Sequence, residues 1–157
     1  IGRDILRAVV RSLDGRLPST VLTDLVFKKL GITTVQQLIA EVYRPGRGKE
    51  FIAGFSSLLP EAVKHKDSAA IRISEQAGTE LCALVGPVAQ KLGMQKGTLA
   101  LSGSVLLHDE AVREALKREM KKKLPGLETA LPLSDAASGA ALLARQFLLR
   151  GTADNAD

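Results

Sequence analysis

A short strand that ends in small residues is the feature that most constrains this chain. Residues 98–101 form an apolar run long enough for one buried strand, and Ser102, Gly103 and Ser104 follow directly. A charged amphipathic helix is predicted from about Glu110. Open α/β sheets bind ligands where a strand gives way to a helix, because a glycine there lets a flat ring or a phosphate approach the backbone. The residues alone leave two alternatives open: a ligand-binding turn, or a tight turn without a ligand.

The same region predicts a parallel sheet. A strand at 98–102, a helix at 110–123 and a strand at 127–131 form the unit from which parallel sheets are built. Two strands are too few for an independently stable sheet. Either the helical first half caps this pair, or further strands precede Ile1. The start at Ile1 rather than Met favours the second alternative and indicates a fragment.

The rest of the chain is predicted to be helical. Apolar residues at helical spacing, with Ser, Thr, Asp and Gly at the expected ends, predict helices at 3–13, 20–30, 34–42, 49–59, 68–92 and 135–149. Pro87, after Gly86, should kink or break the longest one, because proline lacks an N–H and its ring clashes with the preceding turn. The small residues of 136–141 suit close packing against another backbone. Residues 1–150 are expected to form one domain, and 151–157 a disordered tail.

Composition excludes several classes of protein. Aromatic residues make up 3% of the chain and Trp is absent, which argues against a platform for single-stranded nucleic acid. The net charge of +5 comes mostly from residues 117–123 at one helix end, where cations complement the helix dipole. No apolar run approaches the roughly 20 residues of a membrane span. A single cysteine, Cys82, allows no internal disulfide and suits a reducing compartment, so we expect a cytoplasmic protein with no nucleic-acid or membrane partner.

The sequence holds no complete active site. Phosphate-loop, dinucleotide and zinc-protease motifs are absent. The two histidines, His65 and His108, have no acidic or cysteine partner at metal-binding spacing, so no metal site is predicted. Asp14, Asp67 and Asp109 fall at predicted helix ends, where capping explains them without catalysis.

Several segments together resemble a known family. Leu101-Ser-Gly-Ser-Val105 is similar to the adenosine motif of the actin-like sugar kinases. Four further segments resemble N-acetylglucosamine kinases in order and spacing, and they are Gly2 to Gly15, Val42-Tyr-Arg44, Phe51-Ile-Ala-Gly-Phe55 and the small-residue helix 136–144. The wider group is the BadF/BadG/BcrA/BcrD ATPase family, and the resemblance covers about residues 1–149.

This resemblance implies the C-terminal lobe of an actin-like ATPase (ribonuclease H-like) α/β fold, helix-rich and with only part of the sheet in this chain. Ser102, Gly103 and Ser104 would lie against the adenosine of ATP, and Ala53 would contact the nucleotide from another side. Helix packing is the alternative explanation for Ala53.

The resemblance also implies the function. The whole protein would transfer the γ-phosphate of ATP, with Mg²⁺, to an amino sugar such as N-acetylglucosamine. The catalytic aspartate and the phosphate loops would belong to a missing N-terminal lobe or precede Ile1, so this chain alone is expected to be inactive. The apolar helices within 3–42 suggest a homodimer. The alternatives are an ATPase activator of a 2-hydroxyacyl-CoA dehydratase and a non-catalytic helical interaction module that uses the basic helix.

Overall fold

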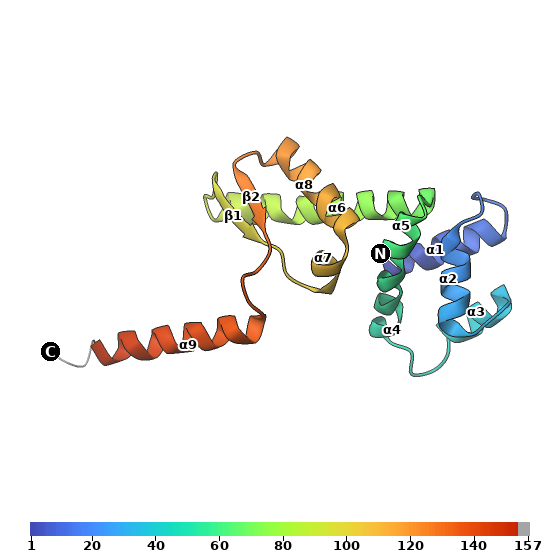
Figure 1. Ribbon diagram of the computed structural model, residues 1–157, viewed down its shortest axis with the longest axis horizontal. Coiled ribbons are helices and arrows are strands. Elements are labelled where there is room, and N and C mark those ends of the chain that lie inside the picture. The colour runs from blue at the N-terminus through green and yellow to red at the C-terminus, as the bar shows by residue number, and fades with distance from the viewer. Residues whose placement is uncertain (154–157) are drawn as a thin grey trace.

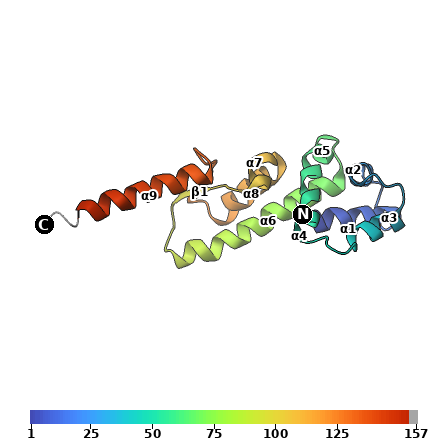
Figure 2. The same ribbon diagram turned by 90° about the horizontal axis from the view of Figure 1, so that it is seen from below.

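A computed structural model describes the backbone of residues 1–153 and the side chains of residues 1–147. One long helix, α6 (Ser68–Lys91), joins a group of helices at one end to a small sheet at the other (Figures 1 and 2). The other elements are α1 (Gly2–Leu13), α2 (Val21–Leu30), α3 (Val35–Val42), α4 (Lys49–Ala53), the 3₁₀ helix η1 (Gly54–Leu58), α5 (Leu59–Lys64), β1 (Gly97–Ala100), α7 (Ser104–His108), α8 (Glu110–Lys123), β2 (Leu127–Ala130) and α9 (Ala136–Ala153).

Local signals set the ends of the first helices as predicted. The Thr20 side chain accepts a hydrogen bond from the N–H of Leu22 at the start of α2, and Gly31 ends that helix with a φ of 66°. Thr34 and Gln37 form a capping box at the start of α3. The apolar faces of these helices meet η1, α5 and the first half of α6 in the larger core, which includes Ile5, Val9, Leu22, Val26, Leu38, Phe55 and Leu59.

The single helix predicted over 49–59 is wrong. The segment divides into α4, η1 and α5, with Gly54 at the first junction. The Ser57 hydroxyl donates a hydrogen bond to the carbonyl of Gly54 at 2.9 Å. Glycine weakens the helix and serine competes with its backbone bonds, so the chain tightens into a 3₁₀ turn here.

The predicted interruption of the long helix does not occur as a break. Helix α6 continues through Pro87 for four more residues, to Lys91. Ala83, whose carbonyl loses its partner to the proline, is exposed, as is Pro87. Water can therefore satisfy that carbonyl, and the cost of proline within a helix falls on a solvated face.

Helices α6 and α8 form the closest packing in the chain. A Cβ added to Gly78 would lie 2.5 Å from the Cβ of Ala115, so the two helices approach where both residues are small. Helix α8 has the predicted bounds, and its buried face includes Leu116 and Met120. These side chains join Cys82 and Leu101 in a second core beneath the sheet. Cys82 is thus a core residue, as predicted.

The sheet has the predicted parallel topology. Strands β1 and β2 pair from Gly97 with Leu127 to Ala100 with Ala130, and the N–H of Leu101 extends the ladder to the carbonyl of Ala130 at 2.8 Å. The expectation of a buried first strand is wrong for most of it, since only Leu99 is partly covered within β1 and full burial begins at Leu101. With two strands in the described residues, helices cover one face of the sheet and the other lacks a second layer.

Helix α9 stands apart from the other elements (Figure 1). The small residues at its start were expected to pack against another backbone, but Ala136, Ala137, Ala140 and Ala141 are exposed, so this expectation is wrong for the described chain. The helix continues to Ala153 rather than Leu149. The predicted tail, 151–157, therefore overlaps this helix in part, and residues 154–157 lie outside the described residues.

Candidate functional site

The turn after β1 has a backbone that only glycine adopts readily. Gly103 has φ 96° and ψ 150°, a region from which side chains are excluded by steric repulsion. Its carbonyl accepts a hydrogen bond from the N–H of Leu107 at 3.0 Å, which ties the turn to α7. Nothing lies within 4 Å of an added Cβ, so the glycine is required by conformation rather than by crowding. Ser102, Gly103 and Ser104 are all exposed.

This turn forms one wall of a cavity of about 470 Å³. The other walls come from the first residue of the chain and from the middle of α6, and the lining residues besides the turn are Ile1, Ala77, Glu80, Leu81, Leu84, Val105 and Leu106. Glu80 is the one charged residue in this lining. The turn therefore lies at a cavity of the size that ligands use, which a nucleotide site there requires.

A second, smaller cavity lies on the other side of Ser104. It measures about 250 Å³ and is enclosed between η1, α5 and α7. Ser104 and Val105 line both cavities, so they separate one from the other. The remaining lining residues are Ser56, Ser57, Pro60, His108 and Asp109. Sequence reasoning missed this cavity, since it depends on residues about fifty positions apart.

Ala53 does not line either of these cavities. It is exposed at the junction of α4 and η1. Its Cα would lie 3.5 Å from a Cβ added to Gly2, while the carbonyl oxygen of Ile52 would lie only 2.0 Å away. The structure thus places Ala53 beside the start of α1, one residue from Ile1, rather than directly against the turn.

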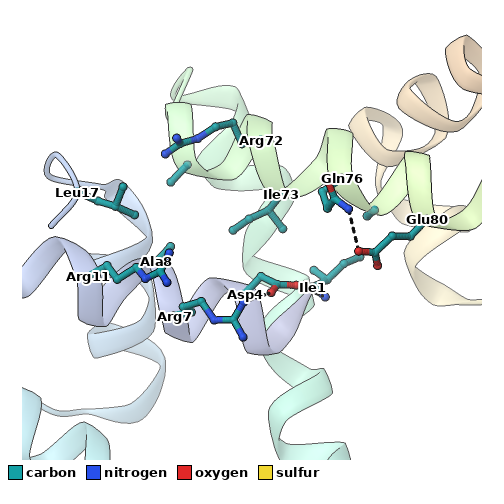
Figure 3. Close-up of a pocket in the computed structure, with 12 residues that line it drawn as sticks. Ile1, Asp4, Arg7, Ala8, Arg11, Leu17, Arg72, Ile73, Gln76 and Glu80 are labelled. Carbon is teal, nitrogen blue, oxygen red and sulfur yellow. Dashed lines mark hydrogen bonds and ion pairs between the residues drawn. The ribbon is translucent and has the colours of Figure 1, made fainter.

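Two further cavities had no counterpart in the sequence analysis. An apolar groove of about 500 Å³ follows α6 and β1 and ends at Ser102, with Leu84 (68% exposed), Val88 and Leu92 along it. The other, of about 320 Å³, lies between α1 and α6 (Figure 3). Arg7, Arg11 and Arg72 line this second cavity. The spacing of arginines along α1 was the only signal for it.

The charged side chains of the α1–α6 cavity are partly paired. Arg7 lies 3.6 Å from Asp4, and the Gln76 amide donates a hydrogen bond to Glu80 at 2.9 Å (Figure 3). Such exposed pairs contribute little to stability. The cavity holds both signs of charge and does not include the turn residues.

The predicted capping roles of the aspartates are confirmed. Asp67 accepts a hydrogen bond from the N–H of Ala70 at the start of α6, and Asp109 accepts one from the N–H of Val112 at the start of α8. Burial raises the pKa of Asp67, but donors from Ala70, Thr20 and Val21 outweigh it and leave the pKa below its ordinary value. His65 and His108 are exposed.

The chain offers no metal centre within its described residues. No group of three or more His, Cys, Asp or Glu side chains lies close enough there to hold an ion. Cys82, at 2% exposure, is sealed in the second core. Among the residues described, no helix is long and apolar enough to span a bilayer.

Comparisons with known proteins place this arrangement in a family. A model of the BadF/BadG/BcrA/BcrD ATPase family matches residues 1–144. The chain is 30% identical over 148 residues to an N-acetyl-D-glucosamine kinase of Dictyostelium discoideum, covering 92% of the chain and 46% of that protein. It is 27% identical over 147 residues to an N-acetylmuramic acid/N-acetylglucosamine kinase of Clostridium acetobutylicum, covering 92% of the chain and 48% of that protein. The chain spans about half the length of these curated relatives. It belongs to the BadF/BadG/BcrA/BcrD ATPase family.

Proposed function

We propose that this chain forms the adenosine side of the ATP site in an ATP-dependent kinase of amino sugars such as N-acetylglucosamine. Membership of an ATPase family supports nucleotide binding, and the two relatives named above are sugar kinases. A homodimer remains part of the proposal. Exposed Leu13, Ile39 and Tyr43 on the first three helices support an apolar contact surface.

One observation carries the proposal: Ile1 and the turn Ser102–Ser104 line the same cavity. The resemblance to sugar kinases implies that the sugar-binding loops come just before Ile1. A nucleotide whose adenosine lies on the turn would then point its phosphates toward the residues that hold the sugar. Phosphoryl transfer depends mostly on such positioning.

The described residues fit the adenosine more than the metal. Small side chains and the glycine backbone at 102–104 leave room for a flat ring, while no cluster of acids is present there to hold Mg²⁺. We therefore assign Mg²⁺, the catalytic base and the phosphate loops to a second lobe. The 157-residue chain alone should not phosphorylate sugar.

The alternatives receive less support. An activator of a 2-hydroxyacyl-CoA dehydratase would need an exposed cysteine to hold an iron–sulfur cluster between subunits, and Cys82 is buried. An interaction module based on the basic end of α8 would need free cations. Lys122 and Lys123 both pair with Glu119, which lowers the net charge of that end.

The test is a binding and turnover assay on the complete gene product. ATP should bind in calorimetry with Mg²⁺, and N-acetylglucosamine should be phosphorylated. Ala53→Leu should weaken ATP binding, whereas Ala40→Leu, at an exposed position of α3, should leave it unchanged. Absence of ATP binding by the wild-type protein would exclude the proposal. Salt-dependent binding of an acidic partner, insensitive to ATP, would favour the interaction module.

A further inference from the structure

A buried carboxylate oxygen beside the smaller cavity has no hydrogen-bond partner. Asp109 is 3% exposed, and its Oδ1 accepts the N–H of Val112 at 3.1 Å. Its Oδ2 is buried and has no partner in the part of the chain that the structure describes. A buried charged acceptor without a donor is costly, so the position favours a donor that the described residues do not supply.

The surroundings of Asp109 suit a flat group that carries such a donor. Asp109 lines the cavity of about 250 Å³ between η1, α5 and α7, together with Pro60 and the small side chains of Ser56 and Ser57. This volume is below that of pockets that hold whole ligands, so it fits one part of a larger molecule. Ser104 separates this cavity from the larger one, which reaches Ile1.

We infer that the smaller cavity seats the adenine base and that Asp109 accepts a hydrogen bond from its exocyclic amine. The inference rests on the proposed nucleotide site. The base would lie behind Ser104, the sugar would cross the turn at Gly103, and the phosphates would enter the larger cavity toward Ile1. Because Oδ2 is covered, a side chain at the rim must turn aside for the base to reach it, and exposed His108 is placed to do so.

The chemistry predicts selection by the amine. Adenine presents its N6 amine as a donor, and a carboxylate oxygen can only accept. A base that lacks the amine would leave Oδ2 buried without a partner, as it is without ligand. Sites built to bond a donor discriminate strongly against analogues without it. Asp109 would thus determine which base is accepted, without touching the reacting phosphate.

The experiment compares ATP with purine riboside triphosphate, which lacks the exocyclic amine, in the complete gene product. Wild-type protein should bind ATP about 10- to 100-fold more tightly, the range expected for one hydrogen bond to a charged group. Asp109→Asn should reduce this preference to near unity. Asparagine caps helices as well as aspartate does, so α8 should be retained. Asp67→Asn, also at a buried cap but outside both cavities, should keep the wild-type ratio.

The outcomes separate the two claims. If wild-type protein binds neither nucleotide, the proposed function fails. If it binds ATP but Asp109→Asn keeps the preference, only the assignment of Asp109 is overturned. Should Asp109→Asn not fold, Ser56→Leu fills the same cavity without changing Asp109. It should weaken both nucleotides at least tenfold, and unchanged affinity would overturn the base site.

Discussion

The hydroxyl of Thr20 donates a hydrogen bond to Oδ2 of Asp67 at 2.8 Å, across 47 positions of sequence. The same oxygen accepts the N–H of Val21 at 2.8 Å, and the other carboxylate oxygen accepts the N–H of Ala70 at 2.9 Å. One side chain therefore satisfies the starts of both α2 and α6. Since α6 carries walls of the proposed site, this contact holds the first helices in place beside it.

Removal of the Asp67 carboxylate should destabilise this junction. Asp67→Ala leaves the donors of Thr20, Val21 and Ala70 without their acceptor, and we expect a loss of about 2–4 kcal/mol in stability. Hydrogen exchange at the Val21 and Ala70 amides should accelerate accordingly. Asp135→Ala removes an exposed cap, at Ser138, and should cost less. Equal effects of the two variants would contradict the central role of Asp67.

Asp67 should also make stability depend on pH in the acid range. Its pKa is lowered in the folded protein because the donors from Ala70, Thr20 and Val21 outweigh burial. A group with a depressed folded pKa stabilises the protein above its unfolded value, about 4, and that contribution is lost as the pH falls through the folded pKa. The thermal midpoint of wild type should exceed that of Asp67→Asn by a constant amount from pH 7 to about 5, and the gap should narrow below about 4. A gap independent of pH would contradict this assignment.

The crossing of α6 and α8 predicts opposite effects at two glycines of one helix. An alanine at Gly78 would place its Cβ 2.5 Å from that of Ala115, so Gly78→Ala should destabilise by about 1–3 kcal/mol. Nothing lies within 4 Å of an added Cβ at Gly86, where Gly86→Ala should stabilise by up to about 1 kcal/mol through helix propensity. Chemical denaturation of both variants checks the pair. A neutral Gly78→Ala would show that the helices do not cross as closely as described.

Sequence reasoning succeeded where the deciding interactions are local. Thr20, Gly31 and Thr34 mark helix ends through bonds within a few residues, and the bounds of α8 and the pairing of β1 with β2 followed from the pattern alone. It failed where solvent or distant contacts decide. Whether Pro87 breaks a helix depends on exposure, which no short window of sequence reveals.

The candidate site divides in the same way. The turn at Gly103 was identified from small residues after an apolar run, because such a sequence ends a strand locally. The cavity behind Ser104 could not be identified, since Ser56 and Asp109 are brought together only by the packing of η1 and α5 against α7. Asp109 itself was assigned to capping, which accounts for one of its two oxygens.

The backbone of Gly103 offers the sharpest test of the nucleotide site. Its φ of 96° with ψ of 150° is costly for any other residue, by about 1–3 kcal/mol, although an added Cβ would meet nothing within 4 Å. Gly103→Ala should therefore shift the turn and weaken ATP binding about tenfold or more, with a smaller change in the thermal midpoint. Gly46→Ala is the matched control, because Gly46 has a φ of 84° in an exposed loop outside both cavities. It should strain its own turn and leave ATP affinity unchanged. If the two variants bind ATP equally well, the turn after β1 is not the nucleotide site, whatever the family of the chain.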